Sequence, residues 1–214
     1  MSKESDNSLQ LRIEELKIRI RELDDPKGDA FRCGMEYKET SGEKILSLSI
    51  FNNQAEIRYP ELIARDIHEG KVLNNTYQAL VCYYLVTSAA SSSHRVKNNW
   101  VSFADLPDGR FYNQAFQGYT GNMLVAPIKF DTKRFSNIAL QLNGSNLDIG
   151  DVAYQFMVLP KVPVAVVYWG GDEEFPSNCK ILFEGTVCNY LPIDACAIIG
   201  SILTQTILKH IINS

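Results

Sequence analysis

Apolar residues recur along the chain with two different periods, and the change from one period to the other predicts where helices and strands lie. In residues 8–24 the spacing alternates between four and three, as along one side of an α-helix, until Asp25-Pro26 ends the pattern. This seam packs either against its own chain or against the same seam of a second copy, which would form a homodimer. It consists of Leu9, Ile13, Leu16, Ile20 and Leu23.

A period of two follows in residues 30–59 and predicts three strands. The first strand alternates from Phe31 to Tyr37, and turns at 40–42 and 52–54 delimit the next two. These connections are too short for crossovers, so we expect an antiparallel three-stranded meander.

Helical spacing predicts the remaining helices. Residues 75–90 are apolar nearly all round, which is typical of a central, buried helix. Gly70 is the expected end of the helix before it, and Asp131 is the expected N-cap of a later one. The predicted helices span residues 61–69, 75–90, 112–116, 132–142 and 192–213.

Two apolar stretches in the second half of the chain predict neighbouring strands at 152–159 and 162–169, with a third apolar piece at 181–183. Together with the meander they predict an α+β fold: a mostly antiparallel sheet packed with several helices, two of them long and terminal. We expect an N-terminal amphipathic helix over residues 1–24 and a single α+β domain over residues 25–214.

Three consecutive carboxylates, Asp172, Glu173 and Glu174, follow the second of these strands after a Gly-Gly turn. If they are hydrated, they form an ordinary acidic loop. If neighbouring aromatic side chains enclose them, desolvation and mutual repulsion raise the pKa of one carboxyl group. Glu173 and Glu174 are then the candidates for a general acid or base. A hard cation such as Mg²⁺ or Ca²⁺ is an alternative partner, but the spacing matches no calcium-binding loop, so no metal site is committed to. A third alternative is that Asp172 or Glu174 pairs with a buried arginine such as Arg58 or Arg110, or caps a neighbouring turn.

Aromatic residues gather between Trp100 and Tyr119, beside turns rather than in periodic runs. They either fill a corner of the core or line a pocket for a small molecule, which the acidic loop closes. The second alternative predicts a non-catalytic binding or accessory module; an enzyme and a dimerising interaction subunit are the competing hypotheses. His94, in a serine-rich loop, is a further candidate ligand residue. The predicted ligand-binding residues are Trp100, Phe103, Tyr112, Trp169, Asp172, Glu173, Glu174 and Phe175.

Charge and cysteine content argue against several classes of function. The net charge is −4, whereas proteins that bind nucleic acids usually present a basic face, so we expect no nucleic-acid partner. The five cysteines include no C-x-x-C pair, which argues against zinc and redox motifs. The N-terminus has no secretory apolar core, and no apolar run reaches the roughly 18 residues that span a bilayer. We therefore expect a cytoplasmic protein without membrane contact, whose cysteines are small buried apolar residues.

Several short motifs occur in a fixed order along the chain. They are Trp100-Val101-Ser102-Phe103, Leu106-Pro107-Asp108-Gly109, Leu159-Pro160-Lys161-Val162-Pro163, Ile181-Leu182-Phe183 and Tyr190-Leu191-Pro192. The most specific motif is Gly-Asp-Glu-Glu-Phe-Pro at residues 171–176, and Asp25-Pro26 followed by Cys33-Gly34 opens the series. From Asp24 to Leu208 the chain therefore resembles the family called domain of unknown function 3786.

The resemblance implies the cytoplasm of an anaerobic bacterium or archaeon and a corrinoid or redox context. Some members of the family carry a four-cysteine iron–sulfur module on the N-terminal side, similar to that of corrinoid iron–sulfur proteins. This chain has no cysteine before Cys33, so the resemblance does not extend to that module. It implies a corrinoid-type cofactor as the first ligand to test, and it supplies no reaction.

Overall fold

A computed structural model of the chain describes residues 3–91 and 99–213. The candidate residue His94 and most of the serine-rich loop lie outside these ranges. The chain forms two compact units, and the prediction of a single domain over residues 25–214 stays a prediction. Unit 1 comprises Met1–Ser93, Leu159–Lys161 and Asn189–Pro192; unit 2 comprises His94–Val158, Val162–Cys188 and Ile193–Ser214.

Two predicted helices of unit 1 pack against each other. Helix α1 (Lys3–Leu23) lies against α3 (Asn75–Ala90), whose predicted bounds are confirmed. Ile13, Leu16 and Ile20 of the α1 seam are each 1% exposed, so these side chains are used in docking within the unit. A homodimer through the same seam stays a prediction, and it would require α1 to leave α3.

The expected first strand is wrong in its first half, where the structure has a helix. Helix α2 (Pro26–Cys33) begins directly after its N-cap residue, Asp25, whose carboxylate accepts a hydrogen bond from the backbone N–H of Gly28. Gly34 ends the helix in the left-handed conformation, with φ 64°. Pro at the first helical position and Gly just past the end are strong local signals, and they outweigh the alternation of residues 31–37.

The predicted helix at 61–69 is also wrong. Residues Ile63–Asp66 form strand β4, which pairs with β3 (Asn53–Tyr59) and extends the meander to four strands in the order β1-β2-β3-β4. Gln78 of α3 holds β4 in place: its side-chain amide accepts a hydrogen bond from the backbone N–H of Ala64 and donates one to the carbonyl of the same residue. The remaining strands are β1 (Glu36–Thr40) and β2 (Glu43–Ile50).

Unit 2 is built on a five-stranded antiparallel sheet in the order β5-β9-β8-β7-β6, so the described part of the chain has the predicted α+β fold. The expected strands β7 (Val152–Leu159) and β8 (Val162–Trp169) are confirmed, and the piece at 181–183 belongs to the longer β9. The other strands are β5 (Trp100–Ser102), β6 (Ser145–Asn146) and β9 (Asn178–Glu184).

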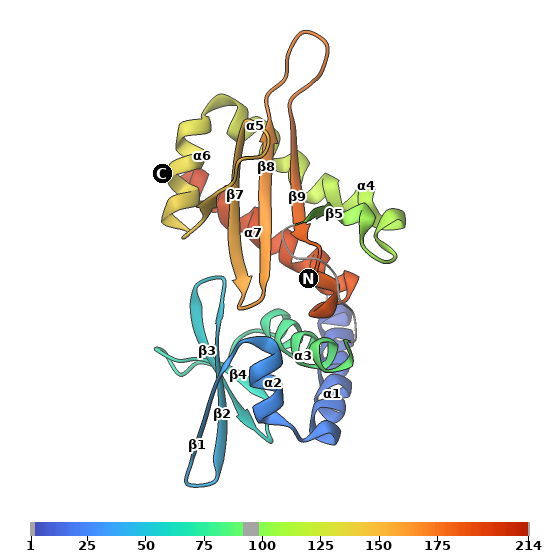
Figure 1. The fold of residues 1–214 in the computed structure, drawn as a ribbon, viewed down its shortest axis with the longest axis vertical. Helices are drawn as coiled ribbons and strands as arrows, with labels where there is room; N and C mark the ends of the chain where they lie inside the picture. The colour runs from blue at the N-terminus through green and yellow to red at the C-terminus, as the bar shows by residue number, and fades with distance from the viewer. Residues whose placement is uncertain (1–2, 92–98, 214) are drawn as a thin grey trace. The chain divides into compact units, whose positions relative to one another are not determined.

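The helices of unit 2 lie on one face of this sheet (Figure 1). Asp131 caps the helix predicted at 132–142 by accepting from the backbone N–H of Arg134. The predicted helix at 112–116 is the middle of a longer one, and one helix containing Pro127 was not predicted, because proline normally interrupts a helix. These helices are α4 (Gly109–Tyr119), α5 (Gly121–Phe130), α6 (Thr132–Gln141) and α7 (Ile193–Asn213).

A buried aromatic cluster holds the helices to the sheet. The rings of Phe103 and Phe116 stack with centroids 4.0 Å apart, and both lie about 6 Å from the ring of Phe183 on β9. Helix α7 admits this cluster at Gly200, where an added Cβ would lie 2.6 Å from a ring carbon of Phe116. The close packing of this core therefore requires glycine at position 200 of α7, the longest helix of unit 2.

Helix α7 is long and apolar enough to cross a membrane by length and composition alone. The core helix of a soluble protein meets the same criterion. Here one side of α7, including Ile199, Leu203 and Ile207, is buried in unit 2, and this burial accounts for much of its apolar content.

We expect Gly200→Ala to lower the free energy of unfolding by about 1–3 kcal/mol, because the new methyl group must displace a buried ring. Gly118→Ala is the matched control, since nothing lies within 4 Å of an added Cβ there. Alanine favours the helix by about 1 kcal/mol over glycine, so the control should be slightly more stable than the wild type. Urea unfolding followed by circular dichroism measures both. Equal stabilities of the two variants would contradict the role assigned to Gly200.

Candidate functional site

The structure distributes the predicted ligand-binding residues over both faces of the unit 2 sheet and one hairpin tip. Phe103 belongs to the buried aromatic cluster on the helix-covered face, whereas Tyr112 is exposed on α4. Trp100 and Trp169 instead share the face that no described helix of unit 2 covers. Asp172, Glu173, Glu174 and Phe175 lie in the loop between β8 and β9.

Trp100 and Trp169 border what we call the tryptophan face. In the strand register Trp100 lies opposite Glu184 and Trp169 opposite Asn178, so the two residues stand near opposite ends of β9. At about 3.3 Å per residue, this places them on the order of 20 Å apart. Both side chains are half-buried. The face consists of Trp100, Ala153, Ala165, Val167, Trp169 and Leu182, with Leu147 and Ile149 packed against it.

The loop between β6 and β7 fixes the Trp169 end of this face. The N–H of Asp151 donates to the carbonyl of Tyr168, and the N–H of Gly170 donates to the Asp151 carboxylate over 2.5 Å. The Lys180 ammonium lies 6.0 Å from the centroid of the Trp169 ring, within the range of a cation–π interaction. The Trp169 indole therefore lies between this loop and the Lys180 ammonium.

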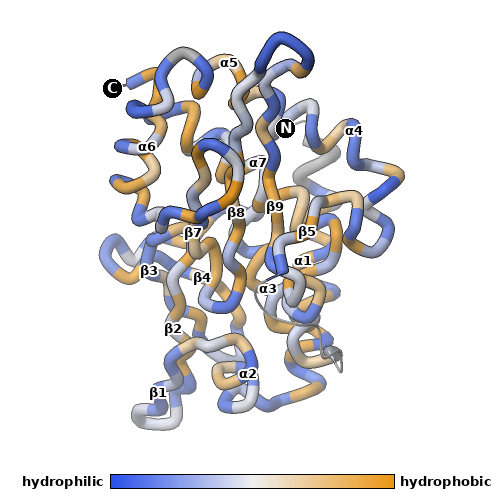
Figure 2. Tube along the Cα trace, turned by 45° about the horizontal axis from the view of Figure 1, so that its top comes forward, coloured by the Kyte–Doolittle hydropathy of each residue, from blue (hydrophilic) through white to orange (hydrophobic). Residues whose placement is uncertain are grey.

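The acidic loop is hydrated rather than enclosed. The Asp172 carboxylate accepts from the backbone N–H groups of Glu174 and Phe175, at 2.8 and 2.7 Å. These donors favour the ionised form and lower the pKa of Asp172, opposite to the direction that enclosure predicts. Glu173 and Glu174 are exposed, and the loop is hydrophilic over much of its length in Figure 2. Their service as general acid or base stays a prediction.

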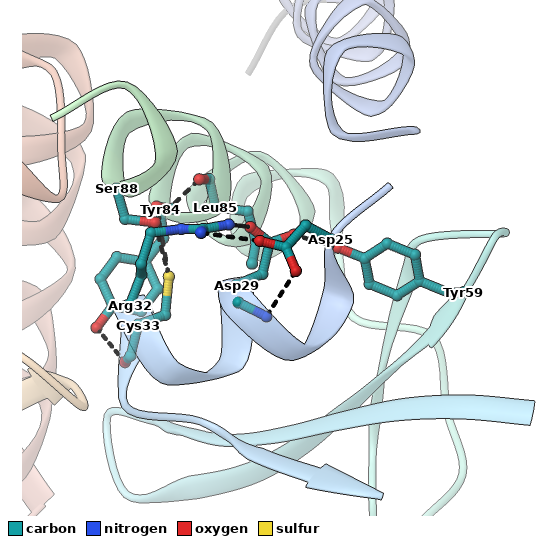
Figure 3. A network of polar contacts seen from close by, with 9 residues as sticks. Asp25, Asp29, Arg32, Cys33, Tyr59, Tyr84, Leu85 and Ser88 are labelled. Carbon is teal, nitrogen blue, oxygen red and sulfur yellow. Dashed lines mark hydrogen bonds and ion pairs between the residues drawn. The ribbon is translucent and has the colours of Figure 1, made fainter. Parts of the chain in front are cut away.

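A buried polar network in unit 1 was not predicted at all (Figure 3). The Asp29 side chain is 1% exposed; it pairs with the Arg32 guanidinium at 2.5 Å and accepts from the Tyr59 hydroxyl at 2.5 Å. Arg32 also pairs with Asp25 at 3.0 Å, while its Nε is buried without a hydrogen-bond partner. Burial, together with the bond to Asp29, raises the pKa of Tyr59, so its proton stays on the hydroxyl.

The same network continues to Cys33 at the end of α2. Its sulfur lies 2.9 Å from the Ser88 hydroxyl, and the Tyr84 hydroxyl donates to its carbonyl at 2.7 Å. Tyr84 also accepts from the backbone N–H of Lys161, in the turn between β7 and β8. Burial raises the pKa of Cys33 to about 12, so the thiol stays protonated and unreactive. The i, i+4 and i+3 spacing of Asp25, Asp29 and Arg32 could have revealed this network, had α2 been recognised as a helix.

Neither the predicted site in unit 2 nor the polar network in unit 1 forms a metal centre among the residues that the structure describes. Within residues 3–91 and 99–213, no group of three or more His, Cys, Asp or Glu side chains is placed to hold an ion. A cavity of about 220 Å³ in unit 1 shares no residue with the predicted site. Its lining is Arg19, Glu22, Leu23, Val86, Ala89 and Ala90.

Two antiparallel sheets with their helices, an apolar sheet face bordered by two tryptophans and a buried ionic network define an α+β domain with a candidate binding surface. The profile of the domain of unknown function DUF3786 matches residues 25–206, so the chain belongs to this family. The matched range begins at Asp25, the residue that caps α2. No match was found among curated proteins or among solved structures.

Asp29→Asn should lower the free energy of unfolding by about 1–3 kcal/mol, because it removes a buried charged partner of the Arg32 guanidinium, which is one-third exposed and keeps Asp25 as its other partner. Asp25→Asn is the matched control: asparagine caps a helix as well as aspartate does, and this carboxylate is exposed. It should leave the stability nearly unchanged. Circular dichroism during urea unfolding distinguishes the two, and equal losses would argue against a special role for the buried carboxylate.

The reactivity of the cysteine thiols provides a second check on which side chains are buried. Burial raises the pKa of Cys82 and Cys179 to about 12, as it does for Cys33, and places that of Cys196 well above its usual range. Cys188 is half-buried. We expect at most one of the five thiols, Cys188, to be alkylated quickly by iodoacetamide in the native protein, and all five in denaturant. Mass spectrometry counts the adducts; two or more rapid additions to the folded protein would contradict the burial.

Proposed function

We propose that the chain is a non-catalytic binding or accessory module that uses the tryptophan face to hold a small molecule or a segment of a partner protein. The observation that carries this proposal is the placement of the two tryptophans. They are the only tryptophans in the sequence, and both border one apolar sheet face.

The chemistry of the face supports binding. Tryptophan offers a large apolar area together with one N–H donor, and it is enriched at the energetically dominant positions of interfaces. The opposite face of the sheet is covered by helices, whereas Trp100, Trp169 and Leu182 remain half-buried. Two of the predicted ligand-binding residues lie elsewhere, because Phe103 is in the core and Tyr112 is on α4. The apolar contacts that we propose for the ligand are therefore those of Trp100 and Trp169. In this proposal Asp172, Glu173, Glu174 and Phe175, which follow Trp169 in the chain and are exposed, form the rim.

A corrinoid-type cofactor is the first small molecule to test, on the grounds of the family resemblance. The proposal includes a cytoplasmic location in an anaerobe, on the same grounds. It does not include a reaction, because Glu173 and Glu174 are exposed, whereas a general acid or base at neutral pH usually depends on a sheltered carboxyl group.

Native mass spectrometry of protein purified without oxygen, combined with titration by cobalamin under selective tryptophan excitation, tests the small-molecule form of this proposal. We expect a bound molecule, or a cobalamin-dependent change in emission beyond the ligand's own absorption, that Trp169→Phe or Trp100→Phe weakens about tenfold. Tyr112→Phe, on exposed α4, is the control and should bind like the wild type. Absence of both a bound molecule and a cobalamin response would overturn the small-molecule form.

A further inference from the structure

We propose that the occupant of the tryptophan face is an amphipathic α-helix of a partner protein that carries lysine or arginine residues at one end. This inference rests on the proposed function and adds the chemistry of the ligand. Three properties of the face support it: the hydrogen bonding of its backbone, its length and the distribution of charge around it.

The backbone of β8 offers no hydrogen bonds to a ligand chain, and that of β9 and β7 offers them only along the stretches that the short edge strands β5 and β6 leave unpaired. Strands β7, β8 and β9 are interior strands of the five-stranded sheet, so much of their peptide groups' bonding capacity is taken up by neighbouring strands. A partner segment lying flat on this face must therefore satisfy its own N–H and C=O groups. An α-helix does so within itself, whereas an added β-strand needs an open sheet edge.

The length of the face suits a helix of modest size. The two tryptophans stand on the order of 20 Å apart along β9, with Leu182 and Lys180 between them on the same side in the register. Because Ala153, Ala165 and Val167 are at most 1% exposed, the accessible part of the face is this half-buried row along β9. At 1.5 Å per residue, a helix of about 13 residues, or between three and four turns, spans this distance. Apolar residues at i, i+3, i+4 and i+7 on one side of such a helix would contact both indoles.

Charge is distributed unevenly along the face. The Trp169 end is surrounded by exposed carboxylates that, among the described residues, form no ion pair. Lys180 lies on the face itself, with its ammonium 6.0 Å from the centroid of the Trp169 ring. Near the Trp100 end, Glu184 is only 7% exposed, and the Asp105 carboxylate accepts from the N–H and the hydroxyl of Ser102. Asp151 and Asp172 are held by backbone N–H donors that keep them oriented without neutralising them. The carboxylates are Asp148, Asp151, Asp172, Glu173 and Glu174.

The acidic end therefore favours a basic partner and sets its direction. Unpaired carboxylates next to an apolar surface increase the association rate of a cationic ligand and disfavour an anionic one. They also favour the positive N-terminal end of a helix dipole. The basic residues of the partner helix accordingly lie over the loop at 170–177, and its opposite end lies at Trp100.

The test uses the whole chain and two synthetic helical peptides of about 16 residues. Both peptides have a leucine stripe on one side; one carries lysines in its first turn, and the other carries glutamates at the same positions. Binding is followed by tryptophan emission, which reports on this face alone because the sequence has no other tryptophan. We expect the basic peptide to bind at least about tenfold more tightly than the acidic one at low salt, and the difference to shrink as salt screens the charges.

Two double variants test the direction of binding. Glu173→Lys with Glu174→Lys should weaken the basic peptide about tenfold and strengthen the acidic one. Glu36→Lys with Glu61→Lys changes the net charge by the same amount at exposed positions of unit 1, and it should leave both affinities within about twofold of the wild type. Because all four positions are exposed, these variants should fold normally.

The outcomes separate this inference from the proposed function. If the two peptides bind equally, or if the basic peptide is insensitive to the reversal at 173 and 174, the basic-helix inference is wrong. If cobalamin changes the emission and neither peptide does, the binding function stands with a small molecule as its ligand, and the inference is again wrong. If neither cobalamin nor the peptides bind, both proposals fail.

Discussion

Strand β8 is apolar on both of its faces, and the structure of unit 2 follows from the need to keep both away from water. Val164 and Val166 point to one side and Ala165 and Val167 to the other, and all four are fully buried. One side is covered by helices and the aromatic cluster of Phe103, Phe116 and Phe183. The other is covered by a loop and two large indole rings, which leave part of their own surface in water. The proposed binding surface is a consequence of this unequal covering.

Unit 1 meets a different constraint, because it buries a charge. The Asp29 carboxylate is tolerated inside the unit because Arg32 and Tyr59 satisfy it, and because Asp25 at the helix start orients the same guanidinium from outside. The network thus ties the first turn of α2 to its last turn and to β3. The family match begins at the capping residue of this helix, and the network includes Asp25 and Cys33, each of which belongs to a residue pair that carries part of the resemblance.

The elements that could be predicted are those in which a long periodic pattern agrees with its local signals. Residues 75–90 and the strands β7 and β8 have no competing pattern, and their bounds are confirmed. Helix α2 was missed because residues 31–37 alternate like a strand, while Asp25, Pro26 and Gly34 determine the outcome. Strand β4 was missed because it exists through pairing with β3 and through Gln78, which are contacts distant in sequence.

The candidate site could be predicted only as a set of residue types. The pairings of Trp100 with Glu184 and of Trp169 with Asn178 place the two indoles on the same side of the sheet, and a shift of one residue in either pairing would put that indole on the other side. No pattern within a single strand contains this information. Phe103 lies on the helix-covered face, against Phe183, as strand alternation predicts for a residue three positions after Trp100, and the chain leaves the strand for a short 3₁₀ turn at that point.

Both indoles belong to unit 2, so the tryptophan emission of this protein follows the unfolding of that unit, whereas the far-ultraviolet dichroism follows the helices and strands of both units. Superposition of the two denaturation curves is therefore a direct measure of whether the halves lose their structure as one cooperative body or in separate steps.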